Sequence, residues 1–201
     1  MRRDELPELH YITPTANVAS ICRHGILSHR RAGTVSHQSI AMEEIQERRR
    51  PVVVPGGRPL HEFVNLYICV RNPMMYKRRT QHQTLTILRV SPDVLDLAGV
   101  VVTDGNASSG YTRFAPAPAG LAIVDRDKVF AEDWRHPNLF EYWEHRRVKC
   151  AEVLVPDHMP PEYLVGAYVS SPESETEVRQ RFDAVGVGLE VSIDRHLFFL
   201  E

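Results

Sequence analysis

The sequence predicts an α+β fold, in which short strands and short helices are mixed at irregular spacing. Apolar runs of strand length, such as TLTILRV at 84–90, stand among polar segments of helix length, without the regular alternation of a doubly wound sheet. No Gly-rich Rossmann or P-loop signature is present. Because 201 residues suit one sizeable core, we expect residues 1–201 to form a single domain.

The first elements are a strand and a helix. Apolar residues at 9–13 predict a short strand. Asn17 is a suitable N-cap, and apolar residues at 18–22 share one face of the helix that follows it. Gly25 is a suitable C′ residue, so we expect this helix to end there.

The next segment alternates between polar loops and regular elements. Residues 28–39 are polar and without a period, which predicts a loop, and residues 40–50 predict a short helix. Prolines and glycines at 51–59 predict a second loop. The apolar run at 63–70 predicts a buried strand, which the Asn-Pro pair at 72–73 ends in a turn.

The middle of the chain reads as two strands joined by a helical turn. Residues 84–90 largely alternate and predict a strand, and Ser-Pro-Asp begins a helical turn within 91–99. Residues 100–103 are strand-like and end at the turn signal 104–106. The Pro/Ala/Gly run at 115–120 predicts a loop.

The C-terminal part completes the α+β pattern. We expect helix within 133–148, a strand at 150–155 and another strand at 168–170. The polar, well-capped segment 174–183 predicts a surface helix.

The composition is that of a soluble globular protein, with 43% apolar and 25% charged residues. No run approaches the ~18 apolar residues that span a bilayer, and the N-terminal residues lack the apolar region of a secretory signal. Three widely spaced cysteines indicate a reducing compartment rather than a disulfide framework. We therefore expect a cytoplasmic protein without a membrane partner.

The net charge of −2 hides an asymmetry between the two parts of the chain. Residues 1–90 carry 14 Lys+Arg against 7 Asp+Glu, whereas residues 91–201 carry 10 against 19. Such an asymmetry indicates a polyanionic partner, unless the charges are interspersed in space and cancel.

One strand carries a carboxylate among apolar residues. In KCAEVLVPD (149–157), Glu152 lies beside Ala151 and the run 153–155. A buried carboxylate is costly unless it is paired, so Glu152 is either functional or an edge-strand residue that faces water. The basic run at 48–50 leaves a similar choice, between a phosphate clamp and a solvated helix end.

Five motifs in a fixed order resemble the DarT family of bacterial toxins, which transfer ADP-ribose from NAD+ to a base of single-stranded DNA. The resemblance extends from residue 9 to residue 182, nearly the whole chain. It implies a split, mostly antiparallel sheet with flanking helices and with NAD+ in the cleft between the two halves. The motifs are LHYITPTANVASICRHGIL (9–27), SIAMEEIQERR (39–49), NPMMYK (72–77), DGNASSGYTRF (104–114) and AEVLV (151–155).

The resemblance implies two catalytic residues, Glu152 and Arg48. Cleavage between nicotinamide and ribose passes through an oxocarbenium-like centre, as in glycosidic cleavage. A carboxylate at Glu152 would stabilise that positive charge and accept a proton from the attacking base. The guanidinium of Arg48 would hold the pyrophosphate or order the active site.

The NAD+ pocket departs from the family pattern in its first strand. The family usually has a histidine where this chain has Tyr11, and His10 lies one residue earlier. Alternation points the two side chains to opposite faces, so either Tyr11 contacts the NAD+ ribose or the alignment slips by one residue. The resemblance implies further NAD+ contacts from Thr13, Asn17, Gly25, Tyr67, Met75 and Tyr76.

Basic and aromatic residues near these motifs are candidates for contacts with single-stranded DNA. Phosphates require cations, and an unpaired base is more accessible to modification than a stacked one. The candidate residues are Arg49, Lys77, Arg78, Asn106, Tyr111, Arg113 and Arg147. Plain solvated charge is the alternative for the basic clusters.

The remaining expectations concern cofactors and partners. NAD+ is expected as a substrate, and no metal site is expected, because the ten histidines form no HExxH or Cys/His pattern. The resemblance also implies a macrodomain antitoxin like DarG, and we expect a monomer. Two alternatives stay open: an acceptor in RNA or protein, or a nucleic-acid-binding relative that has lost activity.

Overall fold

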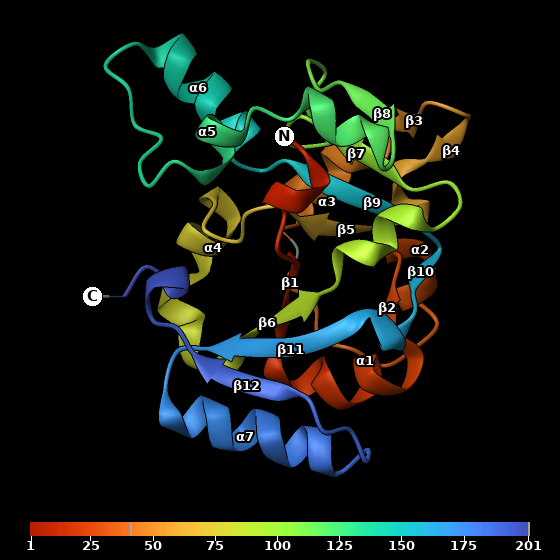
Figure 1. The fold of residues 1–201 in the computed structure, drawn as a ribbon, viewed down its shortest axis with the longest axis vertical. Helices are drawn as coiled ribbons and strands as arrows, with labels where there is room; N and C mark the ends of the chain where they lie inside the picture. Colours follow the sequence, from red (N-terminus) through yellow and green to blue (C-terminus); the bar gives the residue numbers. More distant parts are fainter. Residues whose placement is uncertain (41, 201) are drawn as a thin grey trace.

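The computed structural model describes residues 1–40 and 42–200 (Figure 1). The sequence-based helix at 40–50 includes Ala41, which lies outside the described residues. In the described part of the chain, no helix is long and apolar enough to cross a membrane.

An eight-stranded sheet in the order β12-β11-β6-β1-β5-β9-β7-β8 forms the centre of the fold. Neighbouring strands are antiparallel except β11 and β12, which are parallel. The strands are β1 (Leu9–Pro14), β5 (Phe63–Tyr67), β6 (Leu85–Val90), β7 (Val101–Thr103), β8 (Phe114–Pro116), β9 (Glu152–Pro156), β11 (Leu164–Val169) and β12 (Glu190–Ile193). Two small two-stranded sheets pair β2 (Ile26–Leu27) with β10 (His158–Met159), and β3 (Val53–Val54) with β4 (Arg58–Pro59).

The sheet is split between β1 and β5. These strands are in register only at His10 and Tyr67, whereas β1 pairs with β6 along its whole length, from Leu9 to Pro14. The two halves, β12-β11-β6-β1 and β5-β9-β7-β8, therefore diverge beyond one shared pair. This architecture confirms the predicted α+β class with a split, mostly antiparallel sheet.

Helices flank both halves (Figure 1). Helices α1 and α7 contact each other at the β11–β12 end, and α6 stands at the opposite end of the molecule near β7 and β8. The helices are α1 (Val18–His24), α2 (His29–Ala32), α3 (Glu43–Arg49), α4 (Pro73–Arg78), α5 (Arg126–Phe130), α6 (Leu139–Val148) and α7 (Pro172–Asp183). Short 3₁₀ turns are η1 (Arg3–Glu5), η2 (Thr15–Asn17), η3 (Leu60–Glu62), η4 (Arg79–Thr84), η5 (Pro92–Asp96), η6 (Ala119–Ile123), η7 (Pro161–Tyr163) and η8 (His196–Phe198).

Local chemistry explains where the sequence-based expectations fail. The predicted loop 28–39 contains α2, because the Ser28 hydroxyl accepts a hydrogen bond from the Arg31 amide and caps a short helix. Asn17 does not cap α1; its amide group binds the Gln38 backbone instead. The predicted loop 115–120 contains the end of β8 and the start of η6.

Candidate functional site

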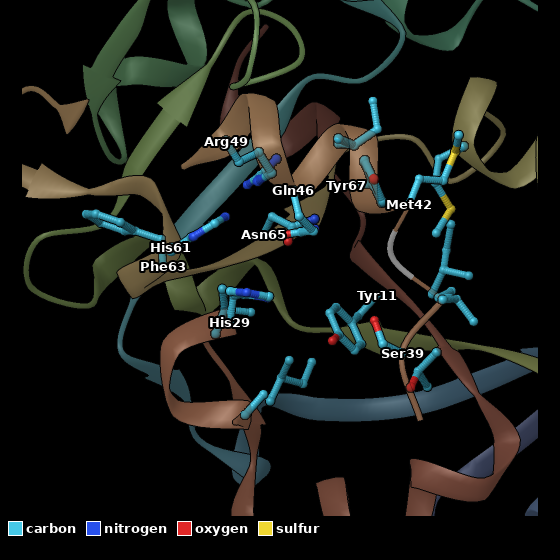
Figure 2. A pocket seen from close by; sticks show the side chains of 18 of the residues that line it. Tyr11, His29, Ser39, Met42, Gln46, Arg49, His61, Phe63, Asn65 and Tyr67 are labelled. Atoms are coloured by element: carbon cyan, nitrogen blue, oxygen red, sulfur yellow. The ribbon is translucent and has the colours of Figure 1, made fainter. Parts of the chain in front are cut away.

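The split of the sheet opens into a cavity of about 490 Å³ (Figure 2). Side chains from β1 and β5 form two of its walls, and α1, α3, α4 and α6 contribute others. In Figure 2, Tyr11 and Tyr67 face the cavity from the two halves of the sheet, and Arg49 and Gln46 reach it from α3. The cavity is therefore lined by segments between residues 11 and 77, by the loop at 106–109, and by α6 and the residues just after it.

Glu152 is buried directly behind the wall of this cavity. It lies at the start of β9, opposite the cavity-lining Tyr67, and only 1% of its surface is exposed. Its carboxylate accepts hydrogen bonds from Nη1 of Arg49 (3.2 and 3.1 Å), Nη2 of Arg49 (3.2 Å) and the amide of Ala107 (3.2 Å). The alternative of a water-facing edge-strand glutamate is thus wrong, because β9 lies between β5 and β7.

Arg49, and not Arg48, forms this buried pair. Both residues line the cavity, but they differ by about 100° around the helix axis, and only the Arg49 side chain is directed at Glu152. Arg49 is 6% exposed, whereas the Arg48 side chain is 61% exposed and pairs with Glu44 one turn earlier. The resemblance assigns the active-site arginine to Arg48 and a DNA contact to Arg49; in the structure Arg48 lies at the cavity wall, and the contact with Glu152 is made by Arg49.

The backbone of Glu152 is fixed from the other side by β7 and the loop after it. The Thr103 hydroxyl accepts a hydrogen bond of 3.0 Å from the backbone amide of Glu152. The following loop, which supplies the Ala107 amide, is held by Arg147, whose Nη1 donates to Asp104 (2.9 Å) and Thr112 (3.2 Å). The carboxylate is therefore held on rigid elements with little freedom of position.

The first strand presents Tyr11 to the cavity and His10 to the opposite face, as the alternation predicts. His10 Nε2 lies 3.1 Å from a Glu8 carboxylate oxygen, outside the cavity lining. Burial raises the pKa of Tyr11. Burial, and after it the Glu152 charge, raises the pKa of Tyr67 well above its usual value, so both phenols stay protonated donors at neutral pH.

The other predicted NAD+ contacts divide into two groups. Thr13, Asn17 and Gly25 line the cavity. Met75 is buried in a core cluster instead, and Tyr76 lies in an aromatic cluster, edge-on to Trp134 and Phe199. Neither lines the cavity, because α4 turns their side chains away from it. From the same helix the cavity receives Pro73, Met74 and Lys77.

The predicted DNA contacts are also divided. Lys77, Asn106 and Arg147 line the cavity, and Tyr111 is 88% exposed. Arg113 binds the Asp104 carboxylate at 2.7 Å while two thirds of its side chain remain exposed. Arg78 is not aimed at the cavity; its Nη2 donates to the Ile40 carbonyl at 2.5 Å.

Sequence reasoning missed a polar group in the cavity wall. His29 and His61 lie in ring contact, with centroids 4.3 Å apart and planes tilted by 41°, next to Gln46 (Figure 2). Burial, then neighbouring positive charge, lowers the pKa of both histidines, so they are neutral at pH 7. Gln46 Oε1 and His61 Nε2 are buried without a hydrogen-bond partner among the described residues. Such atoms are normally satisfied, so they mark where a ligand would bind.

The described residues contain no group of three or more His, Cys, Asp or Glu side chains placed to hold a metal ion. The cavity wall presents a guanidinium, two phenols and neutral imidazoles, and the Glu152 carboxylate lies directly behind it. Together with the split antiparallel sheet, this set is that of an ADP-ribosyltransferase fold with a buried Glu–Arg pair.

The chain belongs to the DarT family. It matches the family described as "ssDNA thymidine ADP-ribosyltransferase, DarT" over residues 10–199, which confirms the resemblance. The DNA ADP-ribosyl transferase of Thermus sp. (strain 2.9) is 32% identical over 158 residues, 73% of either chain. A DNA ADP-ribosyl transferase–DNA ADP-ribosyl glycohydrolase fusion protein of Thermosipho africanus is 31% identical over 205 residues. That match covers 96% of this chain and 50% of the fusion protein, so the chain spans half of its length.

Solved structures of the family share the fold. Thermus sp. 2.9 DarT in complex with ADP-ribosylated ssDNA has a TM-score of 0.85 at 27% identity, covering 96% of this chain and 97% of that one. Thermosipho africanus DarTG in complex with ADP-ribose has a TM-score of 0.81 at 29% identity, covering 96% and 51%. The NAD+ complex of the Thermus protein has a TM-score of 0.80 at 24% identity and covers 96% and 98%.

Proposed function

We propose that this protein transfers ADP-ribose from NAD+ to the base of a thymidine in single-stranded DNA and releases nicotinamide. The observation that carries the proposal is the Glu152 carboxylate, fixed by Arg49 and by the Ala107 amide behind a cavity of about 490 Å³. That volume lies within the range of about 300–1,000 Å³ that small-molecule sites have. Family membership, and relatives named as DNA ADP-ribosyl transferases, support the choice of substrates.

The reaction breaks the bond between ribose C1′ and the nicotinamide nitrogen, whose electron pair leaves with nicotinamide. A positive charge develops on the ribosyl group, and a carboxylate close to it stabilises this charge. N3 of thymine is the only ring nitrogen of the nucleoside that carries a hydrogen. It attacks C1′ while its proton passes to the Glu152 carboxylate, so the new C1′–N bond replaces the old one without net redox change.

Arg49 controls how the carboxylate meets the substrates. The guanidinium lines the cavity, whereas the carboxylate of Glu152 lies behind it. A guanidinium binds phosphate as well as carboxylate in a bidentate way. We assign Arg49 the task of turning part of its fork toward the NAD+ pyrophosphate, which frees one carboxylate oxygen for the ribosyl group and the base.

The rest of the cavity is assigned to NAD+ by the chemistry of its lining. The Tyr11 and Tyr67 hydroxyls are donors that face it from the two halves of the sheet, next to Thr13. Gln46 Oε1 and His61 Nε2 provide unsatisfied polar atoms for an uncharged hydrogen-bonding group. Tyr11 takes the place of the family histidine as the ribose contact, because His10 lies on the opposite face of β1.

A macrodomain protein that removes the modification is the proposed partner of this enzyme. Its basis is the Thermosipho africanus relative, which is named as a fusion of a transferase with a DNA ADP-ribosyl glycohydrolase. The transferase half of that protein corresponds to this chain.

The proposal is tested with NAD+ and a panel of oligonucleotides analysed by mass spectrometry. We expect a mass increase of one ADP-ribosyl group on single-stranded DNA that contains thymidine, and none on the same sequence without thymidine or on the corresponding RNA. Glu152→Gln should abolish the increase, since the amide cannot accept the proton. Modification of RNA instead of DNA, or of neither, would contradict the proposal.

A further inference from the structure

Helix α6 exposes large apolar side chains that the core does not use. Leu139, Phe140 and Trp143 are 54%, 77% and 53% exposed. Phe140 and Trp143, three residues apart on one helix face, meet edge-on with ring centroids 6.0 Å apart and an interplanar angle of 82°. Single exposed apolar residues are common, but a group of them next to a cavity indicates a binding surface.

The helix holds these rings in a defined position. Asn138 caps it by accepting the Phe140 amide at 2.8 Å. On the opposite side, the buried His145 binds the Lys128 carbonyl at 2.9 Å. Just past the helix, Lys149 donates to the carbonyls of two residues in the preceding segment, at 2.8 Å each. The aromatic pair is therefore displayed on an anchored helix.

The aromatic pair continues into the mouth of the cavity. Trp143 and, one turn further, Arg146 and Arg147 line the cavity wall. The Arg147 carbonyl accepts the Asn106 amide, which joins α6 to the loop that carries the 88% exposed Tyr111. Within residues 1–40 and 42–200, Arg147 pairs with Asp104 and Glu144 whereas no carboxylate pairs with Arg146, so the charge of Arg146 is available to a phosphate.

We propose that Phe140 and Trp143 stack on the bases of single-stranded DNA that flank the target base. The inference rests on the proposed function and adds the surface that places the strand. Aromatic side chains stack on any base, and the loss of one stacked base typically weakens binding roughly tenfold or more. When the target base lies in the cavity, Trp143 stacks on the base of the adjacent nucleotide and Phe140 stacks on the base after that. Arg146 binds the phosphate that joins the target nucleotide to the adjacent one.

The size of the surface favours an oligonucleotide over a protein partner. Each aromatic side chain has an area of about 150–250 Å², and only part of it is exposed here. A stable protein interface requires about 800 Å² from each partner, which the three apolar side chains of α6 do not reach. Two stacked bases need only two rings and a cation, as found here.

Binding of a labelled thymidine-containing oligonucleotide, measured by fluorescence anisotropy without NAD+ and at several salt concentrations, tests the inference. We expect Phe140→Leu and Trp143→Leu to weaken binding about tenfold each, whereas Phe140→Tyr and Trp143→Phe keep near wild-type affinity. Leucine keeps the apolar character but lacks the π-face. Val165→Ala, an exposed apolar residue on β11, serves as the matched control and should bind as wild type does.

The salt dependence and the tryptophan emission separate stacking from charge. The leucine variants should keep the wild-type salt slope, whereas Arg146→Gln should reduce it by about one. The oligonucleotide should quench tryptophan emission in the wild type but not in Trp143→Phe, because the second tryptophan, Trp134, is 9% exposed and packed against Tyr76 and Phe199.

Wild-type affinity of both leucine variants would overturn the inference, as would equal losses in the leucine and aromatic variants. If the leucine variants instead lose a protein partner while they bind DNA normally, the surface is a protein interface and the inference fails. The proposed function is tested separately. If the protein transfers ADP-ribose to no oligonucleotide but Trp143→Leu still weakens DNA binding, the proposed activity is refuted and the stacking inference is retained.

Discussion

Replacement of Arg49 by alanine should destabilise the protein and abolish its activity, whereas the same change at Arg48 should do neither. The two arginines are adjacent in one helix, α3, and have the same chemistry. Only Arg49 forms a buried pair, with three nitrogen–oxygen distances of 3.1–3.2 Å to Glu152. The comparison therefore isolates the effect of burial and pairing from that of composition.

The expected magnitudes follow from the burial of the two pairs. Removal of Arg49 leaves the 1% exposed carboxylate of Glu152 with the Ala107 amide as its remaining partner, and loss of one member of a buried pair costs about 3–5 kcal/mol. Arg48 is paired with Glu44 at the surface, where such a pair contributes about 0.3–0.5 kcal/mol. In a domain of this size, 1 kcal/mol corresponds to about 2–4 °C in Tm. Arg49→Ala should thus lower Tm by roughly 10 °C, and Arg48→Ala by at most about 2 °C.

Thermal unfolding followed by circular dichroism gives the Tm values of the two alanine variants. Their activities are measured with the oligonucleotide assay at a temperature that is about 20–25 °C lower than the lower of the two Tm values. Arg49→Lys is the second variant, because lysine keeps a positive charge but cannot form the fork. It should be more stable than Arg49→Ala and still lack most of the activity. If Arg48→Ala lost activity and Arg49→Ala retained it, the assignment of the pair to Arg49 would be refuted.

Three further changes test other parts of the site. Tyr11→Phe should weaken NAD+ binding several-fold in calorimetry, since one donor is lost, whereas His10→Asn on the opposite face of β1 should leave it unchanged; the reverse pattern would favour the shifted alignment. Gly25→Ala should lower the free energy of unfolding by about 1–3 kcal/mol in urea titration, because Gly25 has φ of 74° and a Cβ would collide with the Met159 carbonyl; unchanged stability would show that the backbone adapts. Because burial lowers the pKa of His29 and His61 in the folded state, the unfolded state binds protons first as the pH falls below about 6.5, so the free energy of unfolding should decrease there; a double His→Asn variant should show a flatter pH dependence, and an equally steep one would contradict the assignment.

The residues alone left Glu152 either functional or facing water, and the family resemblance favoured a functional role; its burial in β9 excludes the water-facing alternative. The alternation of β1 predicted correctly that Tyr11 and His10 face opposite sides. That inference depends on the period of two in a strand, which leaves no choice once the strand is placed. The face of a strand on which a side chain lies is therefore the structural property that the sequence predicted best.

The helix phase of α3 was not determined by the sequence. The cavity receives Ile45, Gln46, Arg48 and Arg49 from this helix, but only Arg49 reaches Glu152. In a run of three arginines, a phase error of one residue exchanges the buried guanidinium for an exposed one. The tertiary environment, here the position of Glu152, decides between them.

Contacts between distant segments were not predictable either. The rings of His29 and His61 are in contact although α2 and η3 are separated by about thirty residues, and no motif joins them. Trp143 lies in a segment correctly predicted to contain helix, but its exposure depends on how that helix sits against the rest of the molecule. Local sequence patterns specify helices and strands, whereas contacts between distant residues and the exposure of a side chain are set only when those helices and strands pack together.

Single-turnover transfer to a thymidine-containing oligonucleotide, compared between the wild type and Glu152→Gln under conditions where both are folded and bind NAD+ equally, tests the central claim most directly. Loss of transfer in the glutamine variant with intact NAD+ binding is the predicted result. Transfer at the wild-type rate by Glu152→Gln would show that the chemistry takes place without this carboxylate.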